Sequence, residues 1–80
     1  MELDLHGYEL REALEEILYH LEECQTTGIR EISIIHGYHG GKVLKRYIQS
    51  EGFLKEMAQE GFQLERKTTS NPGISCFFLM

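Results

Sequence analysis

Hydrophobic and polar positions follow two different periods along this chain. Over residues 2–6 apolar and polar side chains alternate, which is typical of a β-strand with one buried face. From Glu9 onward apolar residues recur at steps of three and four, which gives a helix a single apolar face. Weak helix formers and then Gly28 follow, and glycine suits the left-handed end of a helix. This part of the chain therefore predicts a strand and then a long amphipathic helix that ends near Gly28.

The rest of the chain repeats the order of strand and helix and then adds two strands. Residues 31–36 are rich in β-branched side chains, which favours an interior strand. Residues 41–59 have helical spacing, but Ser50, Glu51 and Gly52 interrupt it, so we expect a helix and then a shorter helical turn. Two further strand patterns cover residues 61–66 and 74–80, separated by the turn sequence Asn71-Pro72-Gly73.

The predicted order of elements is βαβαββ. A strand, a helix and a strand in succession imply a parallel pair with a right-handed crossover, and the last two strands read as an antiparallel hairpin. We therefore expect an α/β fold of the α+β two-layer sandwich type, with a mixed four-stranded sheet and two helices. A chain of 80 residues with 41% hydrophobic residues supports one core, so residues 1–80 are predicted to form a single domain.

Charge and cysteine content restrict the classes of function. The net charge of -5 argues against nucleic-acid binding through bulk electrostatics, so any such contact must be local. Glutamates crowd the first predicted helix, whereas Lys42, Lys45 and Arg46 form a close basic cluster. The two cysteines lie far apart, and neither a secretory signal nor an apolar run long enough to cross a bilayer is evident. We expect a cytoplasmic protein without membrane contact.

Both predicted parallel strands end in a His-Gly pair just ahead of a helix. Ligands of open α/β sheets bind outside the carboxyl ends of parallel strands, so we expect His6-Gly7 and His36-Gly37 to lie side by side. Asp4 and His6 are two residues apart on a strand and should share a face. A carboxylate beside an imidazole can fix its tautomer for general acid or base work, and His36 could supply a second proton-transfer group or stabilise developing charge. The alternative is that these are polar residues at strand ends without a chemical role.

The loop after the second strand has the composition of a phosphate-binding turn. Its glycines would let backbone amides approach an anion at the start of the next helix, and a basic stripe on that helix would contact backbone phosphates. The predicted phosphate-binding residues are Gly37, His39, Gly40, Gly41, Lys42, Lys45 and Arg46. The alternative is a flexible turn followed by an ordinary solvated helix face.

The two His-Gly segments resemble motifs of a known family. The sequence LDLHG at residues 3–7 resembles the motif that opens Smr (small MutS-related) domains, and IIHG at residues 34–37 resembles the start of their second motif, HGxGxGxLR. The resemblance covers essentially the whole chain and implies a βαβαββ fold similar to the C-terminal domain of translation initiation factor three. The loop departs from the pattern: His39 stands where glycine is usual, one extra residue precedes Leu44, and Lys45 replaces the usual arginine.

The resemblance implies a function on nucleic acid, because Smr domains are associated with endonuclease activity on DNA or RNA. We therefore predict a small endonuclease with Asp4, His6 and His36 at the reacting phosphodiester. One alternative is a non-catalytic nucleic-acid or ribosome-associated binding module brought to its target by a recruiting protein. Another is a site in which Asp4, His6, His36 and His39 bind a divalent transition metal such as zinc, for structure or for hydrolysis.

Overall fold

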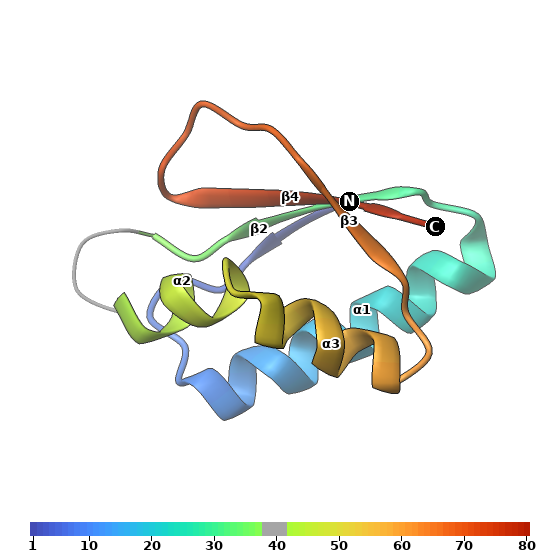
Figure 1. The fold of residues 1–80 in the computed structure, drawn as a ribbon, viewed down its shortest axis with the longest axis horizontal. Helices are drawn as coiled ribbons and strands as arrows, with labels where there is room; N and C mark the ends of the chain where they lie inside the picture. The colour runs from blue at the N-terminus through green and yellow to red at the C-terminus, as the bar shows by residue number, and fades with distance from the viewer. Residues whose placement is uncertain (38–41) are drawn as a thin grey trace.

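The computed structural model describes residues 1–37 and 42–80, and within them a mixed sheet lies against a layer of helices (Figure 1). The strands are β1 (Glu2–Asp4), β2 (Glu31–Ile35), β3 (Leu64–Lys67) and β4 (Ile74–Leu79), and the helices are α1 (Leu10–Thr27), α2 (Lys42–Ile48) and α3 (Glu51–Gln59). All of these helices lie on the same side of the sheet in Figure 1. The predicted two-layer α+β architecture is therefore confirmed.

The strands are ordered β1-β2-β4-β3 across the sheet. Strands β1 and β2 are parallel, with Asp4 opposite Ile35. Strand β4 pairs antiparallel to both β2 and β3, with Ile35 of β2 opposite Ile74. The parallel pair and the final hairpin agree with the sequence prediction. The last strand of the chain lies between β2 and β3, which brings its first residues next to the end of β2.

Helix α1 begins and ends where the sequence predicts. A capping box closes its first turn: the Glu9 side chain accepts from the backbone of Glu12, and the Glu12 side chain accepts from the Glu9 amide at 3.2 Å. The helix ends at Gly28, which has a left-handed φ of 78°. Its buried side chains, Ala13, Ile17, Leu21 and Cys24, form the predicted apolar face.

The expected break in the second helical segment is present, but the expected length of the piece after it is wrong. Helix α3 has nine residues, whereas α2 has seven. The reason is that Ser50 caps a new helix, since its hydroxyl oxygen accepts a hydrogen bond from the Phe53 amide at 3.3 Å. Burial of Phe53 and Met57 then stabilises α3 although Gly52 lies in its first turn.

The core lies between the sheet and the helices. Along β1 and its end, Leu3 and Leu5 are buried, whereas Asp4 is exposed on the opposite face. The ring of Phe77 on β4 packs 5.4 Å from that of Phe53 on α3, measured between centroids. In the parts of the chain that the structure covers, no helix is both long and apolar enough to span a membrane.

Candidate functional site

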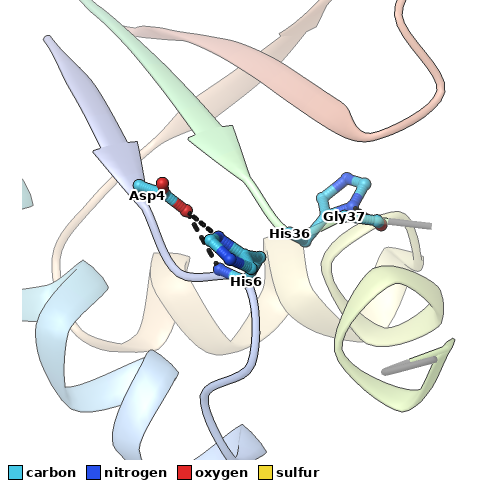
Figure 2. A network of polar contacts seen from close by, with 4 residues as sticks. All are labelled: Asp4, His6, His36 and Gly37. Carbon is cyan, nitrogen blue, oxygen red and sulfur yellow. Dashed lines mark hydrogen bonds and ion pairs between the residues drawn. The ribbon is translucent and has the colours of Figure 1, made fainter. Parts of the chain in front are cut away.

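The end of β1 carries a carboxylate and an imidazole in direct contact. The Oδ1 atom of Asp4 lies 2.6 Å from Nδ1 of His6 and also accepts from the His6 amide at 3.2 Å (Figure 2). These hydrogen bonds hold the pKa of Asp4 below its usual value, with the side-chain bond as the larger cause. Because an ionised carboxylate only accepts, Nδ1 of a neutral His6 carries the proton, and Nε2 keeps its lone pair for chemistry.

This pair is open to solvent. The side chains of His6 and Asp4 are 71% and 56% exposed, because the alternation of β1 turns both away from the core. An exposed pair of this kind contributes little to stability in water even when both groups are charged, so stabilisation of the fold does not explain it. A macromolecular substrate could reach Nε2 directly. The expectation that Asp4 and His6 share a face is confirmed.

The second histidine, His36, lies in the opposite environment. Only 2% of it is exposed, and Figure 2 shows its ring directed away from His6. Its Nδ1 lies 2.8 Å from the Gly37 carbonyl oxygen, which can only accept, so Nδ1 carries the proton. Its Nε2 lies 2.8 Å from Oγ of Ser75, which must then donate its hydroxyl proton to the ring.

Both ring nitrogens of His36 are therefore used within the protein. Burial is the main cause that lowers the pKa of His36, and the charge of Lys45 lowers it further, so the ring is neutral at neutral pH. The predicted role of His36 as a second proton-transfer group does not fit this geometry. Its hydrogen bonds instead fix the turn at Gly37.

The sequence contained a signal for this difference between the histidines. The buried positions of the first strand are Leu3 and Leu5, so an even-numbered residue such as His6 faces outward. In the second strand the buried positions are Ile32 and Ile34, so His36 continues the inward-facing series. Ile35, on the outward face, is also apolar and obscures this alternation in the sequence.

The two His-Gly turns lie side by side, as the sequence predicts. Gly37 has a φ of 76°, and a Cβ atom placed on it would lie 3.5 Å from Cβ of His6. The amides of His36 and Gly37 both donate to the Gly73 carbonyl oxygen at 3.0 Å. Gly37 therefore supplies a left-handed backbone to the turn, and its own amide is not the open anion donor that the sequence suggested.

Sequence reasoning missed the contribution of the β3–β4 turn to this site. Gly73 accepts from both amides of the second His-Gly turn, and Ser75 bonds to the His36 ring from 39 residues away in the chain. Asn71 shapes that turn, because its Oδ1 accepts from the Gly73 amide at 2.9 Å. The turn itself was predicted, but its partners were not, because they depend on where β4 pairs.

The structure describes part of the predicted basic stripe, which consists of Lys42, Lys45 and Arg46. Helix α2 places Lys45 and Arg46 in its last turn, with Arg46 exposed. The positive charge of Lys45 helps to lower the pKa of His36. Lys42 begins the helix, but its side chain lies outside the described residues. The predicted loop residues His39, Gly40 and Gly41 also lie outside them.

The predicted metal ligands do not converge where the structure describes them. Asp4 and His6 bond to each other, and His36 uses both ring nitrogens in other contacts. Over residues 1–37 and 42–80 there is no group of three or more His, Cys, Asp or Glu side chains that could hold a metal ion. The fourth residue of the predicted set, His39, lies outside these ranges.

Comparisons with known proteins support the resemblance that the two His-Gly motifs indicate. The family model of the Smr domain matches residues 3–74. The chain is 36% identical over 75 residues to Endonuclease MutS2 of Acetivibrio thermocellus, which covers 92% of this chain and 9% of that protein. It is 35% identical over 65 residues to Endonuclease MutS2 of Brevibacillus brevis, covering 76% of this chain and 8% of that protein. The chain thus spans less than a tenth of the length of these curated relatives.

A solved structure supports the same relationship. The crystal structure of the Smr domain of Thermus thermophilus MutS2 matches with a TM-score of 0.72 and 28% sequence identity. The match covers 99% of this chain and 96% of that one.

Proposed function

This chain belongs to the Smr domain family, and we propose that it is a small endonuclease that cleaves phosphodiester bonds in DNA or RNA. The observation that carries the proposal is the contact of 2.6 Å between Asp4 and His6, exposed at the end of β1. Support for nucleic acid as the substrate comes from the relatives, which are named endonucleases.

In the proposed reaction His6 acts as a general base. Asp4 accepts a hydrogen bond from the Nδ1–H group of His6 and thereby leaves the lone pair of Nε2 free. The attacking group is water or, in RNA, a ribose 2′-hydroxyl. Nε2 takes the proton of this group as the oxygen of the group attacks phosphorus. The bond from phosphorus to the leaving oxygen breaks in the same displacement, the leaving oxygen takes a proton from solvent water, and protonated His6 then releases its proton to solvent. A positioned base of this kind typically contributes about 10²–10⁴-fold to the rate.

The surrounding residues hold the substrate and the turn. We assign His36 to positioning, because its ring links the Gly37 carbonyl to Ser75. The positive charges of α2, including Arg46, would contact phosphates beside the reacting one. These contacts carry no sequence information and fix only the register of the strand.

The experiment that tests the proposal measures cleavage of labelled single-stranded RNA, single-stranded DNA and branched DNA at low salt, with and without divalent metal. His6→Ala should lower cleavage by about 10²-fold or more and leave affinity unchanged, because it removes the base and no phosphate contact. His20→Ala is the matched control, since His20 lies on α1 and contacts Glu16 and Glu23. Equal cleavage by wild type and His6→Ala would rule out the proposed base. The substrate that is cut distinguishes DNA from RNA.

A second candidate function is a nucleic-acid or ribosome-associated binding module. The observation that favours it is the exposure of Asp4 and His6, because catalytic groups usually work where water is excluded. A wild type that binds strands but cuts none of them would support this function. Affinity and its salt dependence should then fall when Lys42, Lys45 and Arg46 are all replaced by Gln, and His6→Ala should bind as the wild type does.

A further inference from the structure

A cavity of about 250 Å³ lies at the turn end of the β3–β4 hairpin, beyond His36 as seen from His6. It is lined by Gln49 after α2, by Arg66, Lys67 and Thr69 of β3 and the turn, and by Ile74, Ser75 and Cys76 of β4. None of these residues is among the phosphate-binding residues that the sequence predicts. They come from three segments that only the pairing of β4 brings together.

The polar groups of this cavity are donors of the kind that bind phosphate. None of its described lining residues is acidic, although the chain has 13 acidic and 8 basic residues. The guanidinium of Arg66 donates to the Ser50 carbonyl at 2.8 Å and to the Ile48 carbonyl at 3.4 Å. A guanidinium has five N–H donors, so these two bonds leave others for a ligand. The ammonium of Lys67 lies on the other face of the sheet, 2.9 Å from the Glu31 carboxylate and 5.6 Å from the centre of the Phe78 ring, so it is not counted among these donors.

Ser75 joins the cavity to the candidate site. Its Oγ donates to Nε2 of His36 at 2.8 Å and accepts from Nε2 of Gln49 at 3.5 Å. The Ser75 hydroxyl is therefore held by hydrogen bonds within the protein and only lines the cavity. The neutral donors of the cavity are the amide of Gln49 and the hydroxyl of Thr69. Strands β1, β2 and β4 are consecutive neighbours, so β4 lies roughly 10 Å from the strand that carries Asp4 and His6.

We propose that this cavity binds a second phosphate group of the same nucleic-acid strand, a few nucleotides away from the bond at His6. The inference rests on the proposed function, because it needs a strand that lies across the Gly37 turn. One strand could then contact His6, the cations of α2 and the cavity in succession. The cavity would add affinity and set the register of the strand without taking part in the chemical step.

The test places a negative charge in the cavity and the same charge elsewhere. Gln49→Glu should weaken binding of a labelled single strand of about ten nucleotides by about tenfold, because the new carboxylate repels phosphate. The matched control is Gln63→Glu, at an exposed residue whose carbonyl bonds to the Met80 amide at the other end of the hairpin. A second cavity variant, Thr69→Glu, is compared with the same control and repeats the test should Gln49→Glu fold poorly.

Cleavage kinetics separate this inference from the proposed function. Gln49→Glu should raise KM and leave kcat unchanged, whereas His6→Ala should lower kcat. If wild type binds the strand and both cavity variants bind as tightly as their control, the inference is wrong and the proposed function stands. If wild type binds no strand at all, the inference and the proposed function both fail.

Discussion

His6 and His36 occupy equivalent places in two similar motifs and have opposite chemistry. Each ends a strand and precedes a glycine with a positive φ, 83° at Gly7 and 76° at Gly37. The direction of the side chain decides the outcome. His6 points to solvent and contacts Asp4, whereas His36 points into the protein and contacts Ser75. One imidazole is thus open to a substrate, and the other is part of the framework that holds the turn.

The buried His36 predicts a pH dependence of stability. Burial lowers the pKa of the folded histidine below the 6.5 of a free one, so the unfolded chain binds this proton more readily. The stabilising contribution is complete above about pH 6.5 and is lost as pH falls through the lowered pKa. The Tm should therefore fall less between about pH 7.5 and about pH 5.5 in His36→Gln than in wild type. His20→Gln is the control, and an equal fall in His36→Gln and wild type would contradict the argument.

Gly37 and Gly28 offer a matched test of the second turn. Both have a left-handed φ, 76° and 78°, so an alanine at either position should cost about 1–2 kcal/mol of unfolding free energy. A Cβ on Gly28 meets nothing within 4 Å, whereas one on Gly37 lies 3.5 Å from Cβ of His6. Denaturant unfolding should show similar losses for the two variants, and only Gly37→Ala should also reduce cleavage. Equal cleavage by the two variants would show that the Gly37 turn does not position His6.

Among the elements, the junction between helices α2 and α3 is stabilised by the side chain of Ser50. Ser50 donates to the Tyr47 carbonyl at 2.6 Å and accepts from the Phe53 amide at 3.3 Å, so one side chain closes α2 and opens α3. Arg66 donates to the Ser50 carbonyl from β3. The junction therefore holds Gln49 against β4, next to the proposed second phosphate position.

Removing this cap should destabilise the domain measurably. Ser50→Ala is expected to cost about 1 kcal/mol, which lowers the Tm of a domain of this size by about 4–8 °C. Ser70→Ala, at an exposed serine of the β3–β4 turn, is the control and should change the unfolding free energy by less than about 0.5 kcal/mol. Thermal unfolding by circular dichroism measures both. A Ser50→Ala protein as stable as the control would show that packing of Phe53 and Met57 alone defines α3.

At the scale of the whole molecule, charge is distributed unevenly around a net negative total. Glutamates dominate α1, whereas Lys45 and Arg46 on α2 and Arg66 and Lys67 on β3 lie on elements near the second turn. An anionic strand would therefore approach from the side of α2 and β4 and avoid α1. Local attraction of this kind is compatible with a net charge of -5, because charges farther apart than about 10 Å are screened at moderate salt.

The order of the strands and helices and the shared face of Asp4 and His6 follow from the sequence alone. Both depend on short separations along the chain: alternation places residues two apart on one face of a strand, and steps of three and four define an apolar helix face. The contacts of the His36 ring, the hydrogen bonds to Gly73 and the cavity at Gln49 depend instead on the tertiary structure. These arise because β4 pairs beside β2, and local periodicity does not specify which distant strand fills that place.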